Sequence, residues 1–522
     1  MITHNQMESY GYGGEAIFIK LEQRIMLDIV RRIYNAGVIT RSADFQINQL
    51  YNIGYSSEDI KKMLKETMKY SDEYVDYLYD MAIKTDYIGN KELYKQINGN
   101  FIPYEKNAFL QGIVKAAKQK THEKMQNLTQ SLGFVLNEKN GLVEVSLTEY
   151  FKKVLDRIVV DIQTGAFDYN TTLRKAVQEM TNSGVRWIDY ESKYHNRITV
   201  AARRAVMSSI SDMCNMTARD TAAKLGIDTF EVTAHPNARP THAIWQGGIY
   251  TSAELESTCG LGTVTGLQGA NCYHLYYPFV PGVSKRAYTE HQLREWRSQD
   301  EKTYRGKTYT GYEATQRMRQ METNIRAMRE RITLLKEGKG DPLDIMYAQA
   351  RYRTAMDEYV KFAKAMGLKQ QKERIYMDGL GRISNSISNK QLEKNILLYE
   401  GYKKAINKGD ISSFITFEIY QDTAKQIEKE LVGVTTKDGI MITGYKTHFV
   451  DRIIGQYESS NYPVKGKRKG VSVGDVLATL KNPDKISEKN TASGKSRNYH
   501  SNSCIITVNP NTRNLIQTTP KK

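Results

Sequence analysis

The stretch that decides the fold is RITVAARRAVMSSISDMCNMTARDTAAKLGIDTFEVTAHPN, which spans residues 197–237. Its first part has a helical pattern and stops at Gly226, because glycine commonly follows the last turn of a helix. From Ile227 onward apolar and polar residues alternate, which predicts a strand. The chain therefore passes here from helices into a small mixed module, and we predict an α+β fold.

Helical patterns also fill the chain before this point. Leu21, Ile25 and Ile29 recur every four residues, which places them on one apolar stripe of a helix that we expect to stop at Gly37. We predict a mainly helical region over residues 1–226.

Two charged helices are predicted after the mixed module. The first has an apolar seam with steps of three and four residues, formed by Met318, Met321, Ile325, Met328, Ile332 and Leu335. Gly338 and Pro342 interrupt this pattern, and a second helix continues to Gly367. The two helices should form an antiparallel hairpin. Its charged exterior suggests a spacer or a docking arm.

Four regions are expected along the chain. They are a helical region over 1–226, a mixed module containing His and Cys over 227–287, the charged hairpin with a linker over 288–394, and a basic domain over 395–522. In the last region Ser472 and Asp475 have the spacing of a helix cap. Strand-like segments follow at 484–490 and 503–520, with NPNT as a hairpin turn. We therefore expect this domain to combine helices with a small antiparallel sheet.

Composition indicates a folded, multi-domain protein. The chain has 522 residues, of which 40% are hydrophobic and 25% are charged. We expect neither a signal peptide nor a membrane anchor, because no long apolar run occurs. Four widely spaced Cys do not suit a disulfide framework and favour a reducing compartment.

The positive charge is concentrated near the end of the chain. The net charge is +17, and residues 441–522 hold 14 Lys and Arg against 5 Asp and Glu, which gives +9. Basic side chains displace counterions from nucleic acid. Because these basic residues alternate with strand-like segments, we predict a folded domain that binds nucleic acid.

Five His and Cys residues fall close together in HPNARPTHAIWQGGIY and GANCYHLYYPF and in the segment between them. They are His235, His242, Cys259, Cys272 and His274. His and Cys bind zinc at tetrahedral sites, and we predict His235, His242, Cys272 and His274 as ligands. Only one residue separates Cys272 from His274, which is not the spacing of a zinc finger. Three interpretations stay open: buried hydrogen-bonding residues that fix a loop-rich module, a zinc site, or a Cys-His nucleophile, for which the sequence shows no third, orienting group.

These residues also carry a family resemblance. AHPNARPTHAIWQGGIY, CGLGTVTGLQGANCYHLYYPFVPG and YEATQRMRQMETNIRAMRERI resemble the phage minor capsid protein 2 family, which is related to the Mu protein F type of head-morphogenesis proteins. The resemblance extends over residues 10–385. It implies a virion protein of a tailed phage, made in the host bacterial cytoplasm. It further implies contact with the portal and capsid proteins, and a role in head assembly or in DNA packaging and ejection.

The end of the chain carries a second resemblance. THFVDRIIGQY, GVSVGDVLATLKNPDKI and IITVNPNTRNLIQTTPK resemble phage nuclease-like domains of the barnase, EndoU, colicin and RelE group. That group packs a helix bearing His and Arg on a small antiparallel sheet. The resemblance implies RNA cleavage that needs no metal or other cofactor, in which a base removes the 2′-OH proton and cations stabilise the phosphorane.

Candidate residues for this chemistry lie within these segments and between them. His448 and Arg452 lie four residues apart on one helix face, as a proton-transfer group beside a phosphate clamp. The remaining candidates are Thr518 and Thr519 for a hydrogen bond to the scissile phosphate, Arg497 as a second cation and His500 as a second proton carrier.

Three classes of function stay open. The first is a structural and interaction protein of the phage head with an appended effector-like domain. The second is primarily an enzyme, an RNase or toxin delivered with the genome. The third is a DNA-binding structural protein whose basic end has no catalytic activity and neutralises phosphate. Metal-independent RNA cleavage separates the first two from the third.

Overall fold

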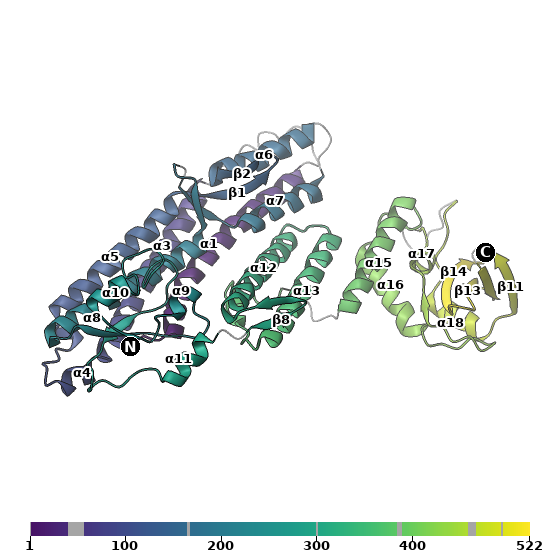
Figure 1. Ribbon diagram of the computed structural model, residues 1–522. Helices are drawn as coiled ribbons and strands as arrows, with labels where there is room; N and C mark the ends of the chain where they lie inside the picture. The colour runs from purple at the N-terminus through teal and green to yellow at the C-terminus, as the bar shows by residue number, and fades with distance from the viewer. Residues whose placement is uncertain are drawn as a thin grey trace. The chain divides into compact units, whose positions relative to one another are not determined.

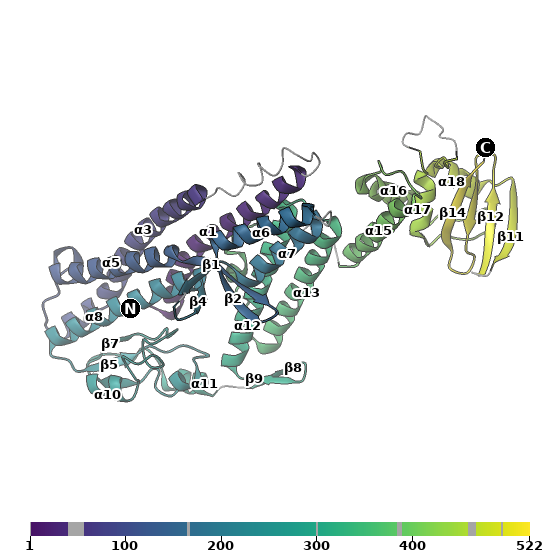
Figure 2. The same ribbon diagram turned by 90° about the horizontal axis from the view of Figure 1, so that it is seen from above.

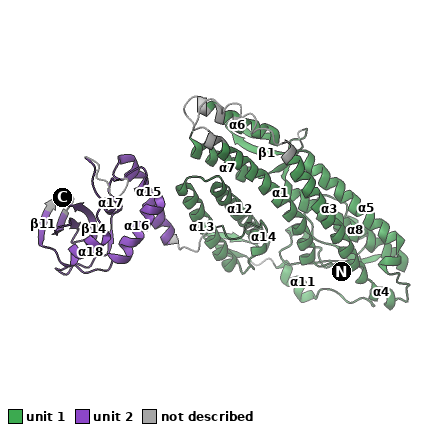
Figure 3. Cartoon of the chain, turned by 180° about the vertical axis from the view of Figure 1, so that it is seen from behind, with its two compact units in different colours: residues 1–385 green, residues 386–522 purple. Residues whose placement is uncertain are grey.

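The computed structural model describes residues 2–39, 57–163, 168–189, 191–298, 301–383, 389–457, 466–491 and 494–521. The chain forms two compact units, residues 1–385 (unit 1) and residues 386–522 (unit 2), as Figure 3 shows. Helices predominate and the sheets are small, so the predicted α+β class is confirmed. Within the described residues, no helix has the length and apolar character needed to cross a membrane.

Long helices form the body of unit 1 (Figures 1 and 2). They are α1 His4–Ile39, α3 Ser57–Ile88, α5 Ala108–Gln130 and α8 Ile198–Leu225, with the short α4 Lys91–Gln96 and the 3-10 helix η1 Tyr104–Lys106 between α3 and α5. The predicted apolar stripe is confirmed, since Leu21, Ile25 and Ile29 are at most 1% exposed. The predicted stop at Gly37 is wrong, because Gly37 lies inside α1. Packing of α1 on α3 and α8 outweighs the cost of one helical glycine, about 1 kcal/mol.

A four-stranded antiparallel sheet packs beside these helices in the order β2-β1-β3-β4. Its strands are β1 Leu132–Glu138, β2 Gly141–Ser146, β3 Arg186–Asp189 and β4 Tyr194–Arg197, and the helices α6 Leu147–Gln163 and α7 Tyr169–Ser183 pack against β1. The sequence did not predict this sheet. The first five residues of β1 are all buried, so the strand lacks the alternation that marks a half-buried strand.

The passage from α8 into the mixed module follows the prediction. Gly226 ends α8 in the left-handed conformation, with φ 65°, which glycine adopts at little cost. The strand β5 Thr229–Val232 then lies at the centre of a sheet in the order β6-β5-β7, with β6 Ile249–Thr251 and β7 Tyr276–Pro278. The connections contain only α9 Pro240–Ala243 and α10 Ser252–Ser257, so this module is rich in loops.

The predicted helical hairpin is formed by α12 Gly311–Glu337 and α13 Pro342–Met366. The elements α11 Glu290–Arg297, β8 Lys302–Tyr304 and β9 Lys307–Tyr309 precede it, and α14 Lys372–Tyr376 follows it. The expectation of a spacer is wrong, because α12 packs on α1 and α7 and its apolar seam joins the core of unit 1. Docking of a partner on the hairpin stays a prediction. Arg197 reinforces this packing by bonding Glu330 of α12 and Glu22 of α1.

Unit 2 packs helices on one side of a five-stranded sheet (Figure 2). The helices are α15 Asn389–Lys408, α16 Phe417–Glu430, α17 Thr447–Ile454 and α18 Val473–Lys481. The strands are β10 Gly444–Tyr445, β11 Lys485–Thr491, β12 Gly494–His500, β13 Cys504–Val508 and β14 Asn514–Pro520, in the order β10-β14-β13-β12-β11. All pairs are antiparallel except β10 and β14, which are parallel.

Several local predictions for unit 2 are confirmed. Ser472 caps α18 by accepting a hydrogen bond from the Asp475 backbone N, and the hairpin over 503–520 is present as β13 and β14. The strand β12 was not predicted, because GKSRNYH lacks alternating apolar residues. The helix α15 starts at Asn389, ahead of residue 395, and packs into the core of unit 2. The four predicted ranges stay predictions.

Candidate functional site

Three of the predicted zinc ligands meet in the mixed module of unit 1. His242 lies in α9, whereas Cys272 and His274 lie in the segment that leads into β7. The two Nδ1 atoms are 3.4 Å apart, and Cys272 Sγ lies 3.7 Å from His242 Nδ1 and 3.5 Å from His274 Nδ1. These atoms form a triangle in which each side chain offers one donor to a metal ion.

The other two members of the sequence cluster lie outside this triangle. His235 stacks its ring on the ring of His274, with centroids 4.6 Å apart, and is not among the described residues whose donor atoms converge. Cys259 is buried in a small core with Trp245 and Leu255. The structure therefore joins three of the four predicted ligands and places the fourth, His235, in ring contact with His274.

Hydrogen bonds fix the tautomers of both ligand rings. His242 Nε2 lies 2.9 Å from the Thr265 carbonyl oxygen, and His274 Nε2 lies 3.2 Å from Gln246 Oε1. Both oxygens only accept, so each Nε2 must carry the proton. Burial lowers the pKa of His242 to about 4, and it lowers the pKa of His274 well below the usual value. Both rings are therefore neutral near pH 7 and keep an unprotonated Nδ1.

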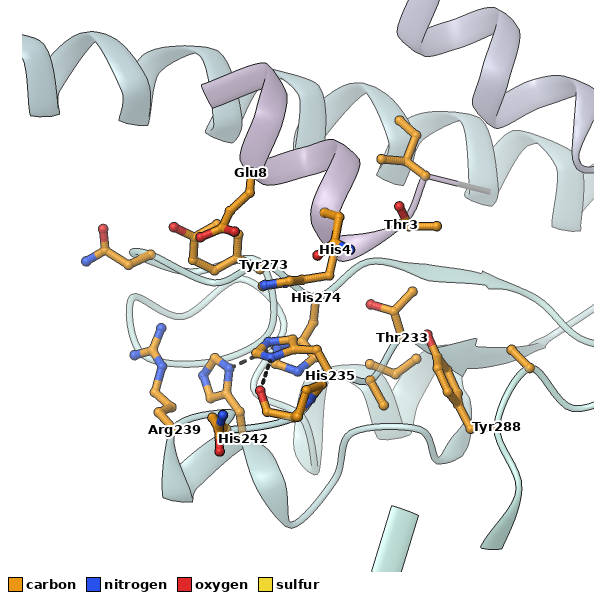
Figure 4. Close-up of a pocket in the computed structure, with 18 of the residues that line it drawn as sticks. Thr3, His4, Glu8, Thr233, His235, Arg239, His242, Tyr273, His274 and Tyr288 are labelled. Atoms are coloured by element: carbon orange, nitrogen blue, oxygen red, sulfur yellow. Dashed lines mark hydrogen bonds between the residues drawn. The ribbon is translucent and has the colours of Figure 1, made fainter. Parts of the chain in front are cut away.

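Further imidazole rings stack on His274 of the triangle, and Figure 4 shows His4, His235, His242 and His274 grouped together. His4, at the start of α1, stacks on His235 with ring centroids 4.1 Å apart. Burial lowers the pKa of His4 and of His235 to about 4. His4, His235, His242 and His274 all line a cavity of about 1120 Å³. Near pH 7 these four rings are therefore neutral and add no positive charge to the cavity wall.

The loop that carries Cys272 is held in an unusual backbone conformation. Asn271 has φ 56°, in the left-handed region that favours glycine, and a Cβ at Gly269 would lie 2.4 Å from the Val264 carbonyl oxygen. Arg239 supports the loop by donating from its guanidinium to the Ala270 carbonyl oxygen at 2.7 Å. The loop is thereby fixed where Cys272 reaches the two rings.

In unit 2, α17 places His448 and Arg452 together, as their spacing predicts. Arg452 Nε donates to His448 Nε2 at 3.1 Å. On the other side of the ring, His448 Nδ1 lies 3.3 Å from Asp451 Oδ2. The His448 side chain is 41% exposed. The imidazole is therefore held between a carboxylate and a guanidinium while it remains accessible to solvent.

Asp451, which holds His448, is itself held by a hydrogen bond from the core of unit 2. Tyr420 of α16 donates its hydroxyl to Asp451 Oδ1 at 2.7 Å. Burial raises the pKa of Asp451 above its usual value, and burial also raises the pKa of Tyr420. Asp410, His448 and Asp451 also offer donor atoms within 4.8 Å of one another, so this place can in principle accept a cation.

No described contact joins the other candidates in unit 2 to His448. Thr518 is 0% exposed and donates to the Ile505 carbonyl oxygen at 3.3 Å, so its hydroxyl does not face a substrate. Thr519 and His500 both pair with Ile505, on the sheet face opposite to Thr518.

Arg497 and His500, both on β12, already have partners. The Arg497 guanidinium bonds Asp438 at 2.6 Å and also bonds Glu488. His500 Nε2 lies 2.9 Å from Ser487 Oγ. Of the six predicted residues, the described contacts therefore join only His448 and Arg452.

Sequence patterns missed the residues that position these two clusters. Asp451 lies three residues after His448. This spacing places both side chains on one helix face, so their contact could have been predicted from the sequence. Tyr420, Thr265 and Gln246 are remote in sequence from the residues they contact or lie in irregular segments, so no local pattern marks them.

In comparisons with known proteins, one protein family matches, and the match lies within unit 1. Residues 2–363 match the family of phage minor capsid protein 2, which is more than half of the chain. No curated protein and no solved structure matches the sequence or the fold. The match covers α1 to α12 and most of α13, including the triangle of His242, Cys272 and His274. The protein therefore belongs to the phage minor capsid protein 2 family and has a structural role in the virion, together with other proteins of the phage head.

Proposed function

We propose that unit 1 attaches the protein to the portal region of a tailed-phage head and acts there in assembly or in DNA packaging and ejection, while unit 2 cleaves RNA without a metal. Family membership supports the location in the particle. The contacts Asp451–His448–Arg452 on a half-exposed helix are the observation that carries the enzymatic part.

The chemistry follows from the direction of these contacts. Asp451 accepts from Nδ1–H of His448 and so leaves the lone pair on Nε2. When a phosphate binds, the Arg452 guanidinium moves from Nε2 to the phosphate oxygens, because a charged pair is stronger than its bond to a neutral ring. His448 Nε2 then takes the 2′-OH proton, O2′ attacks phosphorus, and the 5′-oxygen leaves with a proton from water.

RNA cleavage by the full chain and by residues 386–522 tests this proposal, because unit 2 has its own core. We expect cleavage in EDTA that yields 2′,3′-cyclic phosphate ends. His448→Ala should reduce the rate by about 10²- to 10⁴-fold. Lys425→Gln is the control, because Lys425 is exposed on α16 and is not among the candidate catalytic residues, and it should retain the wild-type rate.

Two outcomes would contradict metal-free cleavage by His448. If EDTA abolishes activity and Mn²⁺ restores it, the reaction uses a cation at Asp410, His448 and Asp451. If folded unit 2 leaves RNA intact under all conditions, unit 2 is not a ribonuclease.

The alternative is a DNA-binding structural unit, favoured by the net charge of +9 over residues 441–522. In that case DNA binding should weaken steeply as salt increases, because counterions compete for the phosphates. His448→Ala should leave this binding unchanged. Salt-dependent binding in the absence of cleavage supports this alternative.

Attachment to the head requires a separate test. Quantitative mass spectrometry of purified particles should detect both units, and crosslinking in the particle should join unit 1 to the portal protein. Particles that contain crosslinks only to the shell protein would contradict the portal location and leave the enzymatic proposal untouched.

A further inference from the structure

We propose that His242, Cys272 and His274 bind one zinc ion that fixes the mixed module of unit 1. The triangle has the right size. Zinc bonds of about 2.0 Å to nitrogen and 2.3 Å to sulfur at tetrahedral angles place two nitrogens about 3.3 Å apart and nitrogen and sulfur about 3.5 Å apart. The corresponding separations are 3.4 Å between the two Nδ1 atoms, and 3.5 and 3.7 Å between Sγ and each Nδ1.

The donor atoms also have the right protonation. A histidine that binds a metal usually donates its other ring N–H to an oxygen, which orients the ring. His242 donates to the Thr265 carbonyl oxygen and His274 donates to Gln246 Oε1. Both Nδ1 lone pairs therefore point into the same small space, 3.4 Å apart, where two lone pairs repel each other unless a proton or a cation lies between them.

The sulfur has features of a thiolate ligand. The His274 backbone N donates to Cys272 Sγ at 3.4 Å, a contact that stabilises negative charge on sulfur. Two imidazole nitrogens and one thiolate form a set that suits zinc and not the hard cations Mg²⁺ and Ca²⁺, which prefer oxygen. The ligand set therefore selects a transition metal of the zinc class.

Three side chains leave a fourth coordination position for water or a further ligand. His242 and His274 line the cavity of about 1120 Å³, although they are only 1% and 2% exposed. The ion links α9 to the loop before β7, two segments more than twenty residues apart. Because this module is rich in loops, such a link replaces packing that a larger core would provide.

Zinc analysis of the full-length protein tests the proposal. Protein expressed with added zinc and purified without chelator should contain about one zinc ion per chain. Cys272→Ser and His242→Asn should lose most of it, whereas His291→Asn, at an exposed position outside the cluster, should retain it. Folded wild-type protein without zinc would overturn the proposal, as would retention of zinc by both ligand variants.

Cobalt substitution keeps the proposal testable if a ligand variant fails to fold. Wild-type protein loaded with Co²⁺ should show a thiolate-to-cobalt charge-transfer band and the intense visible bands of a tetrahedral site. Gln246→Ala leaves all three ligands in place but removes the bond that orients His274, so it should weaken zinc binding by about 10- to 100-fold. A weak octahedral cobalt spectrum without a sulfur band would contradict the assigned ligands.

Discussion

Unit 1 and unit 2 use their ionisable side chains in opposite ways. In unit 1 several of these groups are buried and bonded to one another: Arg329 and Asp378 form a two-bond pair in which both side chains are 1% exposed. In unit 2 the buried core is mainly apolar, and His448 and Arg452 lie at its accessible edge. Buried charge pairs hold one arrangement of helices, whereas accessible groups can exchange protons and bind anions.

This contrast fits a division of labour within one chain. A particle protein needs a rigid body. Arg197 links α12 to α1, because it bonds both Glu330 of α12 and Glu22 of α1. The RNA cleavage that we propose for unit 2 requires that His448 exchange a proton with solvent and substrate. The following changes test whether the polar groups of each unit perform these different tasks.

The largest effect is expected at Arg329. Arg329→Met leaves the Asp378 carboxylate buried without its partner, so we expect unit 1 to lose about 3 to 5 kcal/mol of unfolding free energy. Urea unfolding with separate signals for the two units measures this loss, and the transition of unit 2 provides an internal reference.

An exposed pair supplies the matched control. Arg31 bonds Glu337 with both side chains well exposed, so Arg31→Met should cost less than about 1 kcal/mol. Arg329→Met combined with Asp378→Leu should recover much of the loss, because no unpaired charge remains. Equal effects of the two single arginine variants would remove the contrast between buried and exposed pairs.

Arg452 provides the corresponding test in unit 2. Arg452→Ala removes the cation beside His448, and we expect RNA cleavage to fall by about 10²- to 10³-fold with little change in stability. Arg452→Lys should recover only part of the rate, because an ammonium cannot bond two phosphate oxygens in parallel. If Arg452→Ala unfolds unit 2 instead, Arg452 is a structural residue like Arg329.

Glu330 makes the stability of unit 1 depend on pH. Burial raises the pKa of Glu330 to about 7, whereas its usual value is 4.5. The folded state therefore binds more protons between these values, so the contribution is greatest below pH 4.5 and is lost as pH rises through 7. The unfolding free energy of Glu330→Gln minus that of wild type should therefore increase by about 2 kcal/mol from pH 5 to pH 8. Parallel stability profiles of the two proteins over this range would show that Glu330 is ionised throughout.

Sequence patterns predicted the parts of the molecule that repeat or have local caps. The stripe of Leu21, Ile25 and Ile29 and the cap at Ser472 were predictable because helical geometry relates residues only a few positions apart. The strand β1 was not predictable, because a strand buried on both faces has no alternation.

The two clusters show the same limit. The spacing of His448 and Arg452 gave their contact, and the density of His and Cys indicated His242, Cys272 and His274. His235 falls outside the triangle because its ring stacks on His274, which is distant in sequence. The spacing of residues in the sequence does not predict such a contact. The burial of Thr518 depends on strand register, which is set by the whole sheet.

The smallest effect is expected at Tyr420. This residue belongs to the core of unit 2 and also bonds the carboxylate beside His448. Tyr420→Phe removes the hydroxyl that donates to Asp451 and leaves the ring in the core of unit 2, so we expect a loss of about 1 kcal/mol in stability. Asp451 then holds His448 less firmly, and cleavage should fall a few-fold with an altered pH profile. Tyr402→Phe is the control, because the Tyr402 hydroxyl donates to the Ile415 carbonyl oxygen, away from Asp451. Equal losses of cleavage in the two variants would mean that the bond to Asp451 supports the fold of unit 2 and not the orientation of His448.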